Sequence, residues 1–307
     1  MTELIKRASA EARAFGRRER DRSARREASL DGVSAKPARK PRDQDYVTEA
    51  LPHEGRRKPR FAPVTFSEES GVRYLHFGTE WVQGAMRLRQ PDKLELEYAQ
   101  QMMGWLLFLD PPAKVVQLGL GSASLTKFCY RFLPKTFTEA VELNPAVVVA
   151  ARSMFELPPD DKRLVVTEAD AWDYVNDPER SGTIGALQVD LYDATARGPV
   201  LDSAAFYRAC RESLVQPGVV TVNLFGDHPS FLRNMKQLGV AFDNRVLALP
   251  EVHDGNRIAY AFSGPALSFE WAALERRAAY IEQTLRLPAR SWVKGLKAVR
   301  PGPVFTV

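Results

Sequence analysis

Residues 114–145, KVVQLGLGSASLTKFCYRFLPKTFTEAVELNP, decide the fold of this 307-residue chain. The stretch opens on a short apolar run of the kind that forms a buried strand, and it turns at Gly119 and Gly121. A helical run over 123–133 follows, and a second apolar run ends on Glu142. The order of strand, glycine turn, helix and strand predicts a unit of two parallel strands joined by a helix.

The glycine turn has the features of a nucleoside-binding loop. Glycines let the backbone approach a ligand closely, and the start of a helix offers unpaired N–H groups. Glu142 lies 21 residues after Gly121, a spacing that suits a carboxylate binding the two hydroxyls of a ribose. Position 124 is serine rather than the third glycine of a dinucleotide fingerprint, which favours a single nucleoside. The alternative is that Gly119 and Gly121 only make a tight turn.

Strand-like and helix-like segments alternate along the rest of the chain. This alternation predicts an α/β fold in which a mostly parallel sheet carries helices on both faces. Ligands of such sheets bind beyond the C-terminal ends of the strands. Beyond the first unit, strands are expected at 164–167, 184–191, 219–224, 241–248 and 258–262, and helices at 94–109, 146–155, 171–176, 203–214, 229–238 and 269–285.

Composition divides the chain into regions. Residues 1–60 carry 17 Lys and Arg against 10 Asp and Glu and few large apolar residues, so a disordered basic tail is expected. Strand-like runs at 62–66, 72–77 and 81–86 predict a small antiparallel β-sheet domain over 61–90. The other expected regions are the main α/β domain over 91–265 and a C-terminal helix and tail over 266–307.

The whole-chain composition argues against several classes of protein. No apolar run reaches the roughly 18 residues of a membrane span, and the N-terminus has no apolar signal segment, so a cytoplasmic protein is expected. Cys129 and Cys210 have no metal-ligand spacing, so we expect buried thiols and no metal site. Outside the tail, 26 Lys and Arg face 28 Asp and Glu, which argues against a specific nucleic-acid partner.

Carboxylates recur where strands are expected to end: after Glu142 come Asp170, Asp190 and Asp193. Asp170, followed by Ala171, suits the amino group of an adenine, and the alternative is a helix N-cap. Asp190 and Asp193 can hold a cationic amine and take its proton, a real task because an amine attacks carbon only when neutral. The alternative is that these two carboxylates cap a solvated loop.

With these residues in place, positions 61–265 resemble the spermidine synthase (polyamine aminopropyltransferase) family, as a divergent member. The resemblance lies in segments that follow the order of the family's motifs. Among them, Val-Glu-Leu-Asn-Pro and Asp-x-x-Asp are the most specific. The segments are the hairpin at 78–83, the glycine loop at 118–123, and the stretches at 141–145, 168–171, 190–194 and 203–207.

The resemblance implies a small β-sheet domain followed by a methyltransferase-like Rossmann domain. It implies transfer of an aminopropyl group from decarboxylated S-adenosylmethionine to a diamine, usually putrescine, and assembly into oligomers such as a homodimer. Asp190 would be the general base, with Asp193 and Tyr192 on the amine. The donor nucleoside would be bound by Gln83, Gly119, Gly121, Ser122, Glu142, Asp170 and Ala171.

The chain departs from the family's pattern at several positions. Ser122 replaces an Asp that contacts the donor's aminopropyl nitrogen, and 96–98 read Leu-Glu-Tyr in place of Tyr-His-Glu. Asn223 stands for Gln, and 250–253 replace Pro-Thr-Tyr-Pro. Two alternatives therefore stay open: a methyltransferase that uses intact S-adenosylmethionine on an unknown substrate, and a catalytically silent paralogue that binds a nucleoside or a partner protein.

Overall fold

The computed structural model describes most of the chain from residue 61 onward. Three expectations lie outside the described residues: the basic tail at 1–60, the role of Asp193, and the segment 193–194 of the resemblance. The described residues are 61–192, 200–226, 228, 230–250, 252 and 255–307.

A three-stranded antiparallel sheet precedes the main fold, with β1 (Val64–Glu69), β2 (Val72–Phe77) and β3 (Gly84–Arg87) in that order. The strand expected at 81–86 begins only at Gly84. The reason is a turn closed by side chains: the Trp81 carbonyl lies 3.0 Å from Nδ1 of His76. The Trp81 N–H, in turn, donates to the Thr79 hydroxyl.

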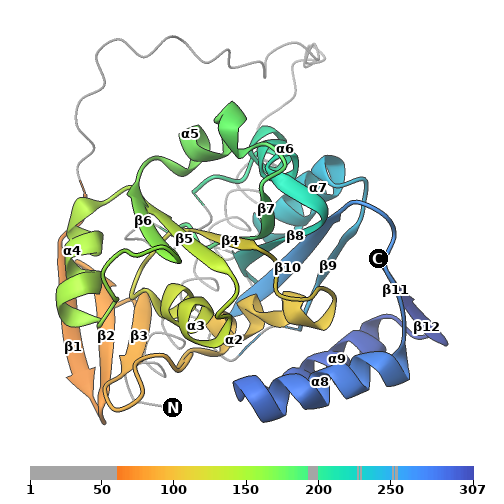
Figure 1. The fold of residues 1–307 in the computed structure, drawn as a ribbon, viewed down its shortest axis with the longest axis horizontal. Helices are drawn as coiled ribbons and strands as arrows, with labels where there is room; N and C mark the ends of the chain where they lie inside the picture. Colours follow the sequence, from red (N-terminus) through yellow and green to blue (C-terminus); the bar gives the residue numbers. More distant parts are fainter. Residues whose placement is uncertain (1–60, 193–199, 227, 229, 251, 253–254) are drawn as a thin grey trace, which may run out of the picture.

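The main sheet has seven strands in the order β6-β5-β4-β7-β8-β10-β9 (Figure 1). The strands from β6 to β8 pair in parallel, and β10 is antiparallel to both of its neighbours. The predicted α/β fold with a mostly parallel sheet is confirmed. The strands are β4 (Lys114–Leu118), β5 (Phe137–Glu142), β6 (Leu164–Glu168), β7 (Ile184–Val189), β8 (Leu214–Phe225), β9 (Val246–Ala248) and β10 (Asn256–Ser263).

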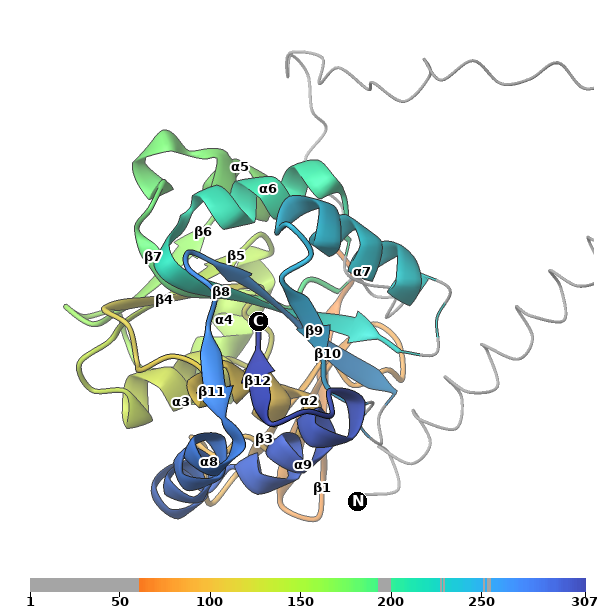
Figure 2. The same cartoon turned by 90° about the vertical axis from the view of Figure 1, so that its right-hand side faces the viewer.

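Helices cover both faces of this sheet, with α5, α6 and α7 on one side and α2 and α3 on the other (Figure 2). Adjacent residues of a buried strand supply the two cores: Val115 packs with the α2 side and Val116 with the α5–α7 side. The helices are α2 (Glu97–Met102), the 3₁₀ helix η1 (Gly104–Leu107), α3 (Ser124–Phe132), α4 (Pro145–Met154), α5 (Ala171–Asn176), the 3₁₀ helix η2 (Pro178–Arg180), α6 (Ala204–Glu212) and α7 (Ser230–Ala241).

The single helix expected at 94–109 is broken between α2 and η1. The Tyr260 hydroxyl of β10 donates to the carbonyl of Gln101. In a continuous helix this carbonyl would instead accept a hydrogen bond from the N–H of Trp105. A Cβ at Gly104 would lie only 2.4 Å from that hydroxyl. The strand expected at 241–248 is also shorter, because α7 runs to its first residue and a turn with two positive-φ residues follows.

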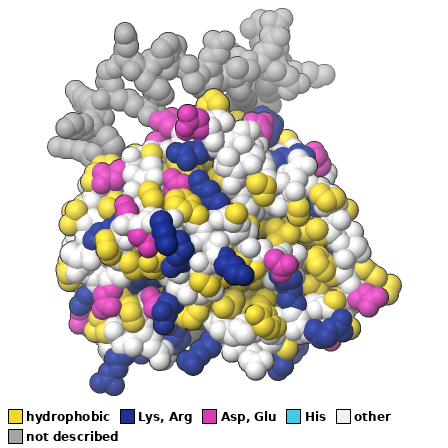
Figure 3. Space-filling view, in the orientation of Figure 1, with side chains coloured by type: hydrophobic (Ala, Val, Ile, Leu, Met, Phe, Trp, Pro, Cys, Tyr) yellow, Lys and Arg dark blue, Asp and Glu magenta, His cyan; other side chains and the backbone are white. Residues whose placement is uncertain are grey.

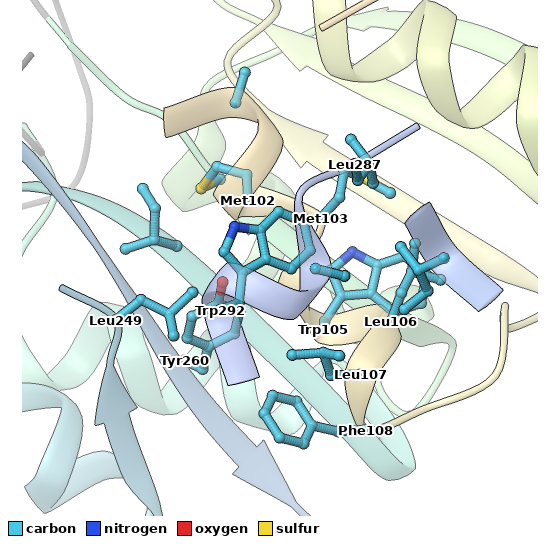
Figure 4. Packing of buried hydrophobic residues seen from close by; sticks show 14 of the residues in the cluster. Met102, Met103, Trp105, Leu106, Leu107, Phe108, Leu249, Tyr260, Leu287 and Trp292 are labelled. Atoms are coloured by element: carbon cyan, nitrogen blue, oxygen red, sulfur yellow. The ribbon is translucent and has the colours of Figure 1, made fainter. Parts of the chain in front are cut away.

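The C-terminal region holds more structure than the one helix expected at 269–285. Helix α8 (Trp271–Leu285) is followed by α9 (Ala289–Val299), and β11 (Ser268–Glu270) pairs with β12 (Val304–Thr306). Trp292 of α9 lies in one cluster with Trp105 and Tyr260 (Figure 4). Helices α8 and α9 therefore close the core over η1.

The surface seen in Figure 3 carries lysine and arginine side chains interspersed with aspartate and glutamate. Beneath it, Lys127 of α3 is an exception, because it is only 1% exposed. Its ammonium donates to the carbonyl of Phe155 at 2.6 Å, and Arg73 of β2 donates to the carbonyl of Met154. Two cations thus satisfy carbonyls at the C-terminal end of α4, where the helix dipole favours positive charge.

The turn after β4 brings two backbones unusually close. Gly119 has a φ of +94°, and a Cβ there would lie 2.2 Å from the carbonyl oxygen of Asp190, the residue after β7. Strands β4 and β7 are neighbours, so the turn and this carbonyl belong to the same edge of the sheet. Only a residue without a side chain fits this position.

Burial of Lys127 predicts a pH-dependent stability. Desolvation lowers the pKa of its ammonium from 10.5 to about 8. Between these values the folded protein binds fewer protons than the unfolded chain, so the free energy of unfolding rises with pH. Relative to Lys127→Met, the wild type should gain roughly 2 kcal/mol between about pH 7.5 and about pH 10. Urea unfolding of both proteins measures this gain, and a difference independent of pH contradicts it.

Replacing Gly119 with alanine should destabilise the fold strongly, because the new Cβ collides with backbone. A matched control is Gly182→Ala, since Gly182 also has a positive φ (+63°) but has nothing within 4 Å of its Cβ position. The control carries only the backbone strain of about 1–2 kcal/mol. Chemical unfolding should show that Gly119→Ala loses at least about 2 kcal/mol more. Equal losses would mean that the close approach is unimportant.

Candidate functional site

Two of the predicted carboxylates flank the turn after β4. The N–H of Gly119 donates to the carbonyl of Val141 in β5 at 2.8 Å, and the N–H of Asp190 donates to the carbonyl of Leu118 in β4 at 2.9 Å. The turn is therefore tied to the ends of β5 and β7. Glu142, the last residue of β5, and Asp190 stand on its two sides, at the edge where ligands of such sheets bind.

Backbone N–H groups from two segments hold the carboxylate of Glu142. Its Oε2 accepts from the N–H of Leu120 at 3.0 Å, and its Oε1 accepts from the N–H of Asn144 at 2.9 Å. Burial raises the pKa of Glu142, and these backbone donors oppose the shift. Glu142 is thus a fixed acceptor between the glycine turn and the start of α4.

The antiparallel sheet contributes its β3 end to the same place. The carbonyl oxygen of Gln83 lies 3.4 Å from the Cβ position of Gly121, which has a φ of +52°. Next to it, a Cβ on Gly84 would lie 2.4 Å from the hydroxyl of Ser122. Gln83, Gly121 and Ser122, predicted from distant parts of the sequence to bind one nucleoside, are therefore neighbours.

The hydroxyl of Ser122 takes part in a short hydrogen-bond chain. Ser124 donates its proton to the carbonyl of Ala85 at 3.0 Å. The 2.9 Å contact between the two serine hydroxyls therefore has Ser122 as the donor. Ser122 is only 2% exposed, and its hydroxyl proton serves the junction between the loop and β3.

Asp170 and Ala171 follow the neighbouring strand β6. Asp170 is the N-cap of α5, and its Oδ1 accepts from the N–H of Trp172 at 2.8 Å. Ala171 is buried with the α5–α7 core. The capping role is thus real, and the role toward an adenine stays a prediction.

Asp190 meets two donors that the sequence interpretation did not assign to it. The Asn223 side chain of β8 donates from Nδ2 to Oδ1 of Asp190 at 2.8 Å, and the Tyr98 hydroxyl of α2 also donates to this carboxylate. Burial raises the pKa of Asp190 to about 6, and the two donors limit the rise. At pH 7 the group is therefore mostly ionised and still basic enough to accept a proton.

Two further side chains complete the polar cluster around Asp190. The Tyr192 hydroxyl donates to the backbone carbonyl of Asn223 at 3.2 Å, and Asn256 of β10 donates from Nδ2 to Oδ1 of Asn223 at 2.9 Å. Burial raises the pKa of Tyr192 far above its usual value, and the nearby charge of Asp190 adds to the rise. Tyr192 is therefore a neutral hydrogen-bonding group at any physiological pH.

Buried hydrogen bonds fix α2 where Tyr98 can reach the sheet. Gln188 of β7 accepts from Gln117 of β4 at 3.0 Å and donates to the carbonyl of Met102 at 3.1 Å. Gln188 is two residues before Asp190, so both side chains point toward α2. The sequence analysis noted Tyr98 only within the Leu-Glu-Tyr segment at 96–98. For Asn223, the available signal was the alternation of polar residues within β8.

The part of the chain that the structure describes contains no group of three or more His, Cys, Asp and Glu side chains that could hold a metal ion. Cys129 and Cys210 are buried free thiols, and burial raises the pKa of Cys129 to about 12. Within those same residues, every helix is too short or too polar to span a bilayer.

Enzymes of known function are similar in sequence to this chain. No family model matches the chain. The polyamine aminopropyltransferase of Neisseria meningitidis serogroup B is 34% identical over 245 residues, which are 80% of this chain and 92% of the relative. That of Chromobacterium violaceum is 34% identical over 235 residues, 76% of this chain and 89% of the relative.

Solved structures share the fold. A probable spermidine synthase from Corynebacterium glutamicum superposes with a TM-score of 0.59 at 17% identity, over 82% of this chain and 95% of that one. Human methyltransferase-like protein 13 in complex with SAH gives 0.54 at 23% identity, over 62% and 93%. The predicted methyltransferase-like fold is thereby confirmed. The long match to the bacterial enzymes shows that the chain belongs to the polyamine aminopropyltransferase (spermidine synthase) family.

Proposed function

We propose that this protein transfers an aminopropyl group from decarboxylated S-adenosylmethionine to a diamine such as putrescine, with Asp190 as the general base. The main support is the position of Asp190, whose backbone touches the Gly119 turn while its carboxylate has a pKa of about 6. A base at the rim of a nucleoside-binding loop suits a reaction in which an amine attacks a nucleoside-linked carbon.

The residues around the glycine turn fit the donor. Gly119 and Gly121, both with positive φ angles, leave the backbone of the turn free of side chains, so that a ligand can approach it closely. The carboxylate of Glu142 suits the ribose hydroxyls. The donor supplies a sulfonium whose adjacent methylene carbon is open to attack. The other donor-binding residues in this proposal are Gln83, Ser122, Asp170 and Ala171.

The acceptor amine has to lose its proton before it attacks. Asp190 takes this proton, the amine nitrogen forms the new C–N bond, and the C–S bond breaks with its electron pair moving to sulfur. Methylthioadenosine leaves as a neutral thioether. Tyr192 and Asp193 hold the amine in this proposal, and the Tyr98 hydroxyl donates a hydrogen bond to the carboxylate of Asp190. Orientation next to a buried base supplies most of the acceleration.

A second candidate, methyl transfer from intact S-adenosylmethionine, is favoured by one observation. Ser122 brings no negative charge to the position where the resemblance expects an Asp against the donor's ammonium, and its proton is already donated to Ser124. A human eEF1A lysine and N-terminal methyltransferase is also 26% identical over 201 residues, 61% of this chain and 28% of the relative. Donor preference separates the two candidates.

The Asp190→Asn variant should lose turnover by at least about 100-fold, because it cannot accept a proton. Its affinity for methylthioadenosine should stay within about twofold. Wild-type kcat/KM should fall as pH drops below about 6, where the carboxylate becomes protonated. Steady-state rates and calorimetry measure these effects. Asp243→Asn, at an exposed ion pair with Arg211, is the matched control. Unchanged turnover in Asp190→Asn removes this residue as the base.

Calorimetry with both donors should show that the decarboxylated donor binds at least about tenfold tighter than intact S-adenosylmethionine. The physical reason is that intact S-adenosylmethionine brings an additional negatively charged carboxylate into a site that already contains the carboxylates of Glu142 and Asp190. A product screen against a panel of diamines should then yield methylthioadenosine and an aminopropylated amine. Tighter binding of the intact donor supports the methyltransferase, and binding of neither supports a silent paralogue.

A further inference from the structure

Asn256 is linked to Asp190 through one intervening side chain, that of Asn223. It is the first residue of β10, which pairs antiparallel with β8 so that Ile258 stands opposite Asn223. Asn223 and Asn256 both face α2, because they alternate in step with Val219 and Ile258 of that core. Asn256 donates from Nδ2 to Oδ1 of Asn223 at 2.9 Å.

The polarity of this chain of hydrogen bonds is set at the Asp190 end. An ionised carboxylate can only accept, so Asn223 has to turn its NH₂ group toward Asp190. The Asn223 amide oxygen then faces the other way, toward β10, and needs a donor there. The NH₂ group of Asn256 is that donor. An acceptor at position 256 would favour the reversed amide, with its oxygen against the carboxylate.

Asn223 has little freedom to find another partner. It is 2% exposed, and a buried amide without a hydrogen bond is unfavourable by about 1–3 kcal/mol. The Asn256 side chain is itself held, because it also hydrogen-bonds Tyr192, whose hydroxyl donates to the backbone carbonyl of Asn223. The three residues form a closed ring next to Asp190.

We propose that Asn256 is a positioning residue for the proton-accepting carboxylate, because it holds Asn223 in the amide orientation that gives an N–H to Asp190. This inference rests on the proposed function of Asp190 as the base. In this role Asn256 acts on Asp190 through Asn223.

The proposal has a consequence for the ionisation of Asp190. A hydrogen bond donated to a carboxylate favours its charged form, so an Asn223 amide that turns freely lets the pKa of Asp190 rise. Among the described residues, the hydroxyl of Tyr98 of α2 donates to Asp190, and Tyr192, whose pKa burial raises far above its usual value, lies near it. The pKa of the Asp190 carboxyl group in the free protein therefore reports the orientation of Asn223.

The test measures this pKa directly by ¹³C NMR of the full chain labelled at aspartate carboxyl carbons, with Asp190→Asn assigning the signal. Asn256→Leu keeps the size of the side chain and removes its donor. It should raise the pKa of Asp190 by about one unit and lower kcat/KM near neutral pH by roughly fivefold to tenfold, with recovery at higher pH. Asn256→Asp, nearly identical in shape, provides a second variant and should raise the pKa at least as much.

The control is the same substitution in an Asn223→Leu background. If Asn256 acts through Asn223, Asn256→Leu should then change the pKa of Asp190 by less than about 0.3 units. An unchanged pKa in the single variant, or an equal shift in both backgrounds, overturns the proposal. If the pKa shift of Asp190 depends on Asn223 but the protein shows no aminopropyl transfer, the positioning role of Asn256 is supported and the proposed function is refuted.

Discussion

The contact between the Gly119 turn and the backbone of Asp190 is the constraint on which the site depends. Both groups follow neighbouring parallel strands, and a Cβ on Gly119 would lie 2.2 Å from the Asp190 carbonyl. With no side chain between them, the glycine turn and Asp190 become parts of one rigid edge, which is where the proposed nucleoside site and the proposed base meet. Glu142 is joined to the other side of that loop through the N–H of Leu120. A reaction between a bound nucleoside and an amine needs this proximity.

The α2 side of the sheet explains how a carboxylate can be buried there. Polar side chains in buried strands have to be paired, and here they are paired with one another. Gln117 and Gln188 anchor α2, while Asn223 and Tyr98 donate to Asp190. Burial raises the pKa of this carboxyl group and the donors restrain the rise, so the group remains an ionised base near neutral pH.

Local patterns in the sequence were sufficient for the parallel unit and for the carboxylates that end its strands. They were insufficient where a distant residue decides the outcome. The Tyr260 hydroxyl breaks the helix expected at 94–109, and no pattern near that helix reveals it. Asn256 meets Asn223 only because β10 returns antiparallel beside β8. Tyr98 faces Asp190 because buried glutamines set the position of α2, which single-helix periodicity does not contain.

The central claim is that Glu142 and Asp190 serve one nucleoside from the two sides of a single glycine turn. A crystal structure with methylthioadenosine tests it most directly. The account predicts the ribose hydroxyls on the carboxylate of Glu142 and the thioether sulfur on the side of the turn that faces Asp190. A nucleoside bound elsewhere, or bound with its sulfur turned away from Asp190, would contradict it.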